Sequence, residues 1–145
     1  MLHDAYPDAL IVSILASVKT IALVGASAHP TRPSFAVLGF LVAQGYRVFP
    51  VNPGLAGGTI QGLTVYGCLG DIVEPVDMID VFRNSEAAGG VVDEALALDP
   101  KPKVIWMQLG VCHEVAAARA EAQGLTVIMN RCPKIEIAKL SGVVG

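Results

Sequence analysis

Charged residues are scarce in this sequence of 145 residues. Lysine, arginine, aspartate and glutamate together make up 16% of the chain, against an average of about 25% in soluble domains. The formal net charge is −3 and no block of like charge appears, so the chain offers no general field for nucleic acid. With 53% apolar residues and a mean hydropathy of +0.58, the composition is typical of a sheet covered on both faces. Burial of surface in an oligomer would give the same numbers.

Cysteines are few and far apart. Cys68, Cys112 and Cys132 form no C-x-x-C pair, so neither a disulfide framework nor a zinc site is indicated, and we expect no bound metal. The three histidines have no serine or carboxylate partner in sequence, so no catalytic triad is indicated. The apolar runs are too short to cross a bilayer, and the N-terminus lacks the basic start of a signal peptide. We therefore expect a cytoplasmic protein with reduced thiols and no membrane contact.

Short apolar runs alternate with helical segments along the chain. Strands are expected near residues 20–25, 47–51, 77–82, 103–108 and 125–130, and helices near 8–18, 34–44, 85–98, 111–124 and after 134. This alternation with short connections predicts an α/β protein: a Rossmann-like three-layer αβα fold with a mostly parallel sheet of about five strands. No repeat, low-complexity tract or linker divides the chain, so residues 1–145 are expected to form one domain.

Local signals refine the boundaries of these elements. Asp8, Ser34 and Ser85 are predicted as helix N-caps. The glycine-rich stretch 54–70 is expected to be a loop with a short extended piece near residues 63–66. Gly89 and Gly90 lie inside an expected helix, where each costs about 1 kcal/mol relative to alanine. Close packing against the sheet is one reason for their presence.

The stretch from Ile21 to Ser34 carries the clearest functional signal. An apolar strand breaks at Gly25, passes through small and polar residues, and reaches Ser34 at the head of the next helix. A helix N-terminus collects unpaired N–H groups and a partial positive charge, which favours phosphate. Ala26 and Ser27 are small enough to let a ligand approach the backbone. The loop therefore predicts a site for the diphosphate of a nucleotide-like cofactor, with a simple tight turn as the alternative.

Ligands of such sheets bind beyond the carboxyl ends of the strands. The residues that this rule collects include two arginines and no carboxylate: Gly25-Ala26-Ser27, Asn52-Pro53, Phe82-Arg83, Gln108-Leu109-Gly110 and Arg131-Cys132. A dinucleotide site of the NAD type needs G-x-G-x-x-G and a later acidic residue. Here Ser27 and Pro30 replace the second and third glycines, and the second strand ends at Asn52. With no phosphate loop for ATP either, both NAD and ATP are disfavoured.

An ordered set of motifs resembles the stand-alone CoA-binding domain family, which is similar to the N-terminal CoA-binding domain of the succinyl-CoA synthetase alpha subunit. The motifs run from about residue 18 onward: Val24-Gly25-Ala26-Ser27, Arg32-Pro33-Ser34, Gly45 to Val48, Pro50 to Pro53, Val76 to Met78, Val81-Phe82-Arg83, Trp106 to Gly110, and Asn130 to Lys134. The resemblance implies a Rossmann-like fold and a CoA site on the first loop, the end of the second strand and the loop after the third. It implies no established reaction. The phosphohistidine domain and ATP-grasp partner of the synthetase are absent from the sequence, so we do not expect its ligase activity here.

The chemistry of CoA agrees with these residues, since its diphosphate and ribose phosphate need a helix N-terminus and one or two cations. Ala26, Ser27 and amides near Ser34 are expected to bind the diphosphate, and Arg32 and Arg83 to pair with phosphate oxygens. Asn52 and Pro53 are expected to border the adenosine, with Val51 and Phe82 as apolar walls. The pantetheine arm is expected to run toward Gln108, Leu109, Gly110 and Cys132. For Arg83, an ion pair with Asp80 or Glu86 is the alternative. Phe82 as a core residue is a further alternative.

Cys132 carries a separate hypothesis. It precedes Pro133 and is flanked by Arg131 and Lys134, and nearby cations at a helix N-terminus raise the thiolate content of a cysteine. A reversible mixed disulfide with the thiol of CoA is therefore one prediction, and an ordinary capping-position cysteine is the alternative.

Together these observations predict a non-enzymatic protein that binds coenzyme A or a short acyl-CoA. Two alternatives stay open: an oxidoreductase that uses a nucleotide cofactor, and a docking subunit of an acyl-CoA enzyme. The apolar helix at residues 34–44 hints at a homodimer.

Overall fold

The computed structural model describes residues 2–144, and the side chains of residues 2–140. Its centre is a five-stranded sheet in the order β2-β1-β5-β6-β7. The strands are β1 (Thr20–Val24), β2 (Arg47–Val51), β5 (Met78–Val81), β6 (Val104–Met107) and β7 (Thr126–Ile128). Each neighbouring pair is parallel, so the predicted sheet is confirmed.

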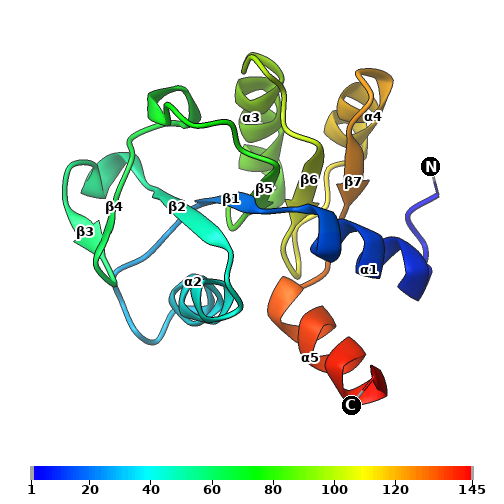
Figure 1. The fold of residues 1–145 in the computed structure, drawn as a ribbon. Helices are drawn as coiled ribbons and strands as arrows, with labels where there is room; N and C mark the ends of the chain where they lie inside the picture. Colours follow the sequence, from blue (N-terminus) through cyan, green and yellow to red (C-terminus); the bar gives the residue numbers. More distant parts are fainter. Residues whose placement is uncertain (1, 145) are drawn as a thin grey trace.

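Helices cover both faces of this sheet and complete the predicted three-layer Rossmann-like fold (Figure 1). One face carries α3 (Ser85–Leu96) and α4 (Glu114–Ala122), and the other carries α1 (Asp8–Ser17), α2 (Pro33–Ala43) and α5 (Pro133–Val144). Alternate residues of each strand enter two separate cores: Ile79 and Val81 face α3 and α4, whereas Met78 faces the other helices. Trp106 is fully buried, as expected for a core residue.

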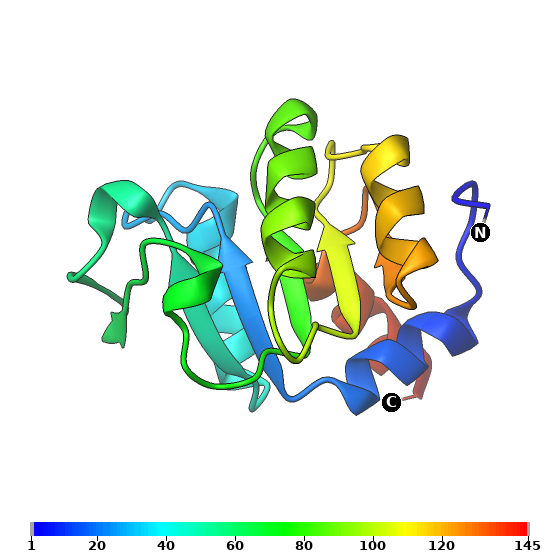
Figure 2. The same cartoon turned by 90° about the horizontal axis from the view of Figure 1, so that it is seen from above.

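The order of the strands indicates where on the sheet a ligand can bind. The chain passes from β2 across β1 to β5, so the direction of winding changes between β1 and β5, where α/β sheets bind their ligands. Figure 2 shows the loop after β1 and the turn after β2 lying together at the carboxyl ends of the strands. The fold therefore brings the predicted functional loops to one edge.

Strand β2 lies at the border of the sheet and contains a proline. The N–H of Arg47 donates to the carbonyl of Lys19, and the carbonyl of Val51 accepts from Gly25. Because side chains and hydrogen-bonding groups alternate along a strand, Pro50 presents its backbone away from β1. Its missing N–H therefore costs no hydrogen bond of the sheet, and its carbonyl accepts from the N–H of Tyr66 at 2.9 Å.

The stretch between β2 and β5 is more ordered than predicted. It contains two 3₁₀ turns, η1 (Pro53–Leu55) and η2 (Leu69–Asp71), and a small antiparallel hairpin of β3 (Thr59–Ile60) and β4 (Leu63–Thr64). The expected extended piece at residues 63–66 is present as β4 and the bridge between Tyr66 and Val51. Strand β3 was not predicted.

The predicted caps are one or two residues too late. Helix α1 has Pro7 at its N-cap instead of Asp8, α2 has Arg32 instead of Ser34 with Pro33 between them, and α3 has Asn84 instead of Ser85. Pro33 lacks an N–H and suits the first helical position. The side chain of Asn84 accepts from the N–H of Ala87 at 2.8 Å and so takes the capping role itself.

The paired glycines of α3 have different surroundings. A Cβ on Gly89 would lie 2.9 Å from Nε2 of His113, whereas a Cβ on Gly90 would meet nothing within 4 Å. Close packing therefore explains Gly89, but its partner is a side chain at the start of α4 and not the sheet.

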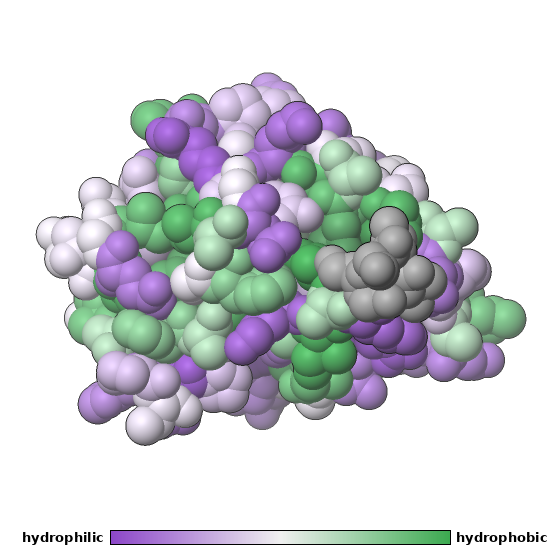
Figure 3. All heavy atoms as spheres, turned by 60° about the horizontal axis from the view of Figure 1, so that its bottom comes forward, coloured by the Kyte–Doolittle hydropathy of each residue, from purple (hydrophilic) through white to green (hydrophobic). Residues whose placement is uncertain are grey.

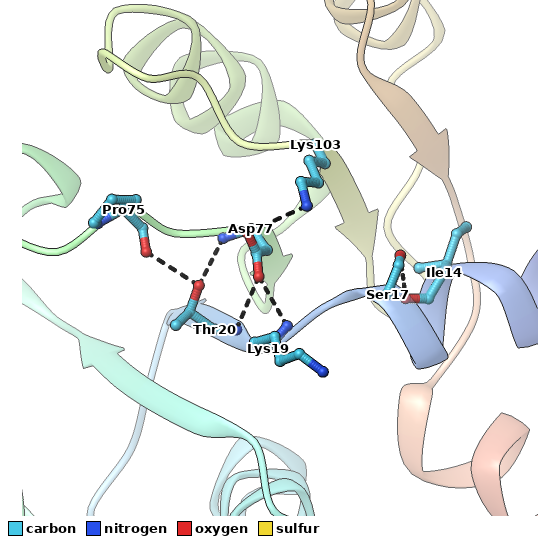
Figure 4. A network of polar contacts seen from close by, with 7 residues as sticks. All are labelled: Ile14, Ser17, Lys19, Thr20, Pro75, Asp77 and Lys103. Carbon is cyan, nitrogen blue, oxygen red and sulfur yellow. Dashed lines mark hydrogen bonds and ion pairs between the residues drawn. The ribbon is translucent and has the colours of Figure 1, made fainter.

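The amino edge of the sheet is held by one carboxylate (Figure 4). Oδ2 of Asp77 accepts from the N–H groups of Lys19 at 2.8 Å and Thr20 at 3.3 Å, and Lys103 lies 3.9 Å from Oδ1. The hydroxyl of Thr20 donates to the carbonyl of Pro75 and accepts from the N–H of Asp77. These bonds fix the start of β1 against the start of β5.

The outward side of α2 is mostly apolar. Ala36, Val42 and Ala43 are exposed, Phe35 and Phe40 are half-buried, and the helix has no charged side chain. Figure 3, which brings this face forward, shows apolar surface interrupted by polar side chains. The homodimer stays a prediction.

Within residues 2–144 no helix has the length and apolar character needed to cross a membrane.

Candidate functional site

Gly25 brings two loops of the site into contact. Its φ is +95°, in the left-handed region that favours glycine. A Cβ at this position would lie 2.6 Å from the carbonyl oxygen of Phe82 and 3.2 Å from Cδ of Arg83. Only glycine fits, so the loop after β1 lies directly against the loop after β5, with the stem of Arg83 across it.

The first loop also bonds to the end of β2. The N–H groups of Gly25 and Ala26 both donate to the carbonyl of Val51, at 3.0 and 3.2 Å. The predicted use of the Ala26 amide by a diphosphate is therefore not supported by its bonding, because that amide already has a protein partner. In the first turn of α2, Pro33 has no N–H and the N–H of Phe35 donates to the carbonyl of Arg32. The N–H of Ser34 and the partial positive charge of the helix start are therefore what this turn offers a ligand.

Consecutive turns shape the rest of this loop. Oγ of Ser27 accepts from the N–H of His29 at 3.1 Å, the N–H of Arg32 donates to the carbonyl of His29 at 3.0 Å, and the N–H of Phe35 donates to the carbonyl of Arg32. The loop thus leads without a break into α2. His29 and Arg32 stand three residues apart on it, and both line the site.

Asn52 ties the two sides of the site together. Its Nδ2 donates to the carbonyl of Ala26 at 2.8 Å, and its Oδ1 accepts from the N–H of Gly54 at 2.8 Å. Both polar groups of this side chain have protein partners, so it holds the first loop beside η1. Its predicted contact with an adenosine stays untested.

These loops enclose a cleft of about 540 Å³ at the carboxyl edge. Its lining contains no aspartate or glutamate: Gly25, Ala26, Ser27, His29, Arg32, Pro33, Ser34, Asn52, Pro53, Phe82 and Arg83. Every predicted site residue except Val51 and those after β6 and β7 is in this set. His29 and Pro33 were missed, although both lie within the loop that the sequence singled out. The arginines and the absence of acid make the cleft suited to an anion.

Arg83 has no ion pair with the carboxylates proposed as its alternative partners in the described chain. Asp80 is fully buried and neither of its oxygens has a hydrogen-bond partner, so its pairing with Arg83 is wrong. Burial raises the pKa of Asp80 well above its usual range. Phe82 is half-buried and serves both purposes considered for it, since it packs on the core and lines the cleft.

The predicted residues after β6 and β7 lie outside the cleft. Gln108 is 6% exposed and its Oε1 has no hydrogen-bond partner. The N–H of Gly110 donates to Oδ1 of Asn130 at 2.7 Å. Cys132 is 6% exposed and belongs to the core that contains Trp106. A buried thiol favours the ordinary cysteine over the mixed disulfide, and the ligand contacts of these residues stay predictions.

Comparison with family models decides the relationship, because a model described as a CoA binding domain matches residues 19–138. The chain belongs to this CoA-binding domain family. Among curated proteins, the uncharacterized protein YneT of Bacillus subtilis (strain 168) is 38% identical over 125 residues, which cover 86% of this chain and 90% of YneT.

Solved structures extend the likeness of this CoA-binding domain. A hypothetical protein from Pyrococcus horikoshii OT3 matches with a TM-score of 0.88 and 33% identity, over 96% of this chain and 95% of that protein. The dinucleotide-forming acetyl-coenzyme A synthetase 1 of Ca. Korarchaeum cryptofilum matches with a TM-score of 0.62 and 25% identity, over 75% of this chain and 25% of the synthetase chain. In that enzyme the similar unit is one part of a larger protein.

Proposed function

We propose that the cleft binds the nucleotide portion of coenzyme A or of a short acyl-CoA, and that the protein does so without catalysis. The observation that carries this proposal is the lining of the cleft. Arg32, Arg83 and His29 surround it with no carboxylate among them, although the chain as a whole has a net charge of −3. Membership of the CoA-binding domain family supports the same class of ligand.

The cleft fits the phosphates of this ligand in charge and position. The first turn of α2 offers the N–H of Ser34 and a partial positive charge, and the guanidinium groups of Arg32 and Arg83 match phosphate oxygens with paired donors. A volume of about 540 Å³ lies within the range of small-molecule sites. The nucleotide end of CoA therefore has a place between the loops after β1, β2 and β5.

The pantetheine arm could leave the cleft along the carboxyl edge of the sheet. The cleft covers the ends of β2, β1 and β5, and the next strands along the sheet are β6 and β7. Gln108 and Gly110 follow β6, and Cys132 follows β7. An arm that leaves the cleft along the carboxyl edge would pass these residues, which is why they remain in the proposed site.

Binding without a reaction is proposed from the side chains that the cleft offers. Ser27 is a hydroxyl in the lining. Its oxygen accepts from the backbone N–H of His29, but among the described residues its O–H donates to no histidine ring. A nucleophile activated by a neighbouring base needs such a side-chain contact. The cleft therefore has the donors of a binding site and lacks the paired groups of an acyl-transfer site.

Thermal unfolding with coenzyme A, acetyl-CoA, NAD and ATP tests the proposal. A ligand present at about 100 times its Kd stabilises the folded state by about 2.7 kcal/mol, which raises Tm by about 5–10 °C for a chain of this size. We expect this shift with CoA and acetyl-CoA and none with NAD or ATP. A shift with NAD alone would support the oxidoreductase alternative, and no shift with any of the four would exclude the proposal.

Docking to an acyl-CoA enzyme is a second candidate, favoured by the likeness to a quarter of an acetyl-coenzyme A synthetase chain. It predicts that this protein associates with a synthetase from which the similar unit has been removed. Sedimentation of the two purified proteins together would measure this, with the intact synthetase as the control. Independent migration in both mixtures would exclude docking of this kind.

A further inference from the structure

The segment from Pro53 to Tyr66, here called the strap, connects the two walls of the cleft. At its root, the N–H of Asn52 donates to the carbonyl of Tyr66, and the N–H of Tyr66 donates to the carbonyl of Pro50, both at 2.9 Å. Further out, Gly57 and Val65 are joined by a backbone bond of 3.0 Å. The strap is therefore a continuous hydrogen-bonded unit that begins at the Asn52–Pro53 wall.

The tip of the strap has an unusual backbone. Gln61 has a φ of +49° and is followed by Gly62 at +80°, between the paired strands β3 and β4. Two-residue hairpin turns with positive φ at both positions favour asparagine and glycine. A glutamine in the left-handed region is unfavourable unless its surroundings hold it there. The side chain of Gln61 shows what holds it.

That side chain lies on α2. Although Gln61 as a residue is exposed, its Nε2 donates to the carbonyl of Phe35 at 2.8 Å. One turn further along the helix, a Cβ on Gly39 would lie only 2.7 Å from Oε1 of Gln61. The amide therefore sits over Phe35 and Gly39, and the absence of a side chain at Gly39 makes room for it.

Phe35 is directly linked to the cleft. Its N–H donates to the carbonyl of Arg32 at 3.0 Å, and Arg32 and Ser34 both line the cleft. The strap thus contacts one wall at its root and the first turn of α2 at its tip. Those are the two sides between which an anion would sit.

We infer that Gln61 is a positioning residue for the anion site: by bonding to Phe35 it holds the first turn of α2 at a fixed distance from the Asn52–Pro53 wall. This inference rests on the proposed function. It differs from a purely structural role of the hairpin, in which loss of the contact would lower stability and leave ligand affinity unchanged.

Two substitutions remove the contact from opposite sides. Gln61→Gly deletes the side chain and suits the left-handed backbone. Gly39→Ala raises the intrinsic helix propensity of α2 and displaces the amide of Gln61. For both, we expect the affinity for coenzyme A in titration calorimetry to fall by about three- to tenfold, the range of one hydrogen bond. The free energy of unfolding in urea should stay unchanged or rise.

The matched control is Gly90→Ala. It makes the same chemical change in a helix, at an exposed position where the added Cβ meets nothing within 4 Å. Its affinity for coenzyme A should equal that of the wild type. If both test variants keep an affinity within about twofold of the wild type, the positioning role of Gln61 is wrong.

Hydrogen exchange of the ligand-free protein separates this inference from the proposed function. The inference predicts faster exchange of the Phe35 amide, which donates to the carbonyl of Arg32, in both test variants and no change in Gly90→Ala, because local opening controls the exchange rate of a bonded amide. Should the wild type bind no coenzyme A, the proposed function fails and the exchange rates alone decide the inference. Unchanged rates would then overturn it as well.

Discussion

The charged side chains at the two edges of the sheet are arranged in opposite ways. At the amino edge, Asp77 and Thr20 bond to the backbone and to each other and close the start of β1 against β5. At the carboxyl edge, Arg32 and Arg83 face a cleft with no carboxylate in its lining. Polar groups that satisfy one another stabilise the fold, whereas those directed at a cleft are available to a ligand. The polar residues at the amino edge therefore stabilise the fold, and the arginines at the carboxyl edge are available for binding.

Gly25→Ala is the change that should break this separation most strongly. The added Cβ combines an unfavourable φ of +95° with a contact of 2.6 Å to backbone, so a substitution at the carboxyl edge should lower the free energy of unfolding by about 2–4 kcal/mol. Urea unfolding measures the loss.

Gly45→Ala is the control for that prediction. Gly45 has a similar φ of +99°, but a Cβ there meets nothing within 4 Å. It should lose only about 1 kcal/mol from the backbone conformation. Equal losses for the two variants would show that the contact with Phe82 contributes nothing.

Arg83→Ala should affect binding alone. Removing a guanidinium that pairs with phosphate costs about 1.5–3 kcal/mol, or about 10- to 100-fold in affinity for coenzyme A. Arg119→Ala is the control, because Arg119 of α4 pairs with Asp93 of α3 at 3.0 Å and does not line the cleft. Calorimetric titration measures both. A wild-type affinity in Arg83→Ala would remove this residue from the site.

Asp77→Ala is the counterpart at the amino edge. It leaves two backbone N–H groups without their acceptor, so the free energy of unfolding should fall by about 1–2 kcal/mol while the affinity for coenzyme A stays unchanged. Asp93→Ala, which breaks an exposed ion pair, should cost less than about 1 kcal/mol. Loss of affinity in Asp77→Ala would contradict the separation of the two edges.

Asp80→Asn tests the effect on stability of a buried carboxyl inside β5, away from both edges of the sheet. Burial raises the pKa of Asp80 in the folded state, so its contribution to stability is fully present below the unfolded pKa of about 3.9 and is lost as the pH rises through the folded value. The variant should be more stable than the wild type at pH 7, by about 1 kcal/mol or more. The difference should vanish near pH 3, as measured by urea unfolding. A difference that does not vary with pH would show that the ionisation of Asp80 is not its cause.

The sequence predicted the sheet well because buried parallel strands are short apolar runs, visible without any knowledge of packing. The carboxyl-edge rule then gathered most of the cleft, since it needs only the ends of those strands. Helix starts were less certain: Asn84 and Ser85 are adjacent and both are capable of capping. The backbone geometry decides between them.

Three features that the sequence did not show depend on the bonding of a loop, on a very short strand or on the packing of a helix. His29 lies in the loop that the sequence singled out, but the turns with Ser27 and Arg32 that bring it to the cleft are not visible in the sequence. Strand β3 is two residues long, too short for a periodic pattern. The burial of Cys132 follows from the packing of α5 near Trp106, which its position before a proline does not reveal.

The proline in β2 has a consequence for the behaviour of the protein in concentrated solution. Border strands are templates on which other chains can add strands. On the outward side of β2, Pro50 has no N–H to give, and its carbonyl already accepts from Tyr66. A strand of another chain that paired with β2 would lack a hydrogen-bond donor at Pro50. This proline therefore hinders the growth of extended aggregates from this side of the sheet.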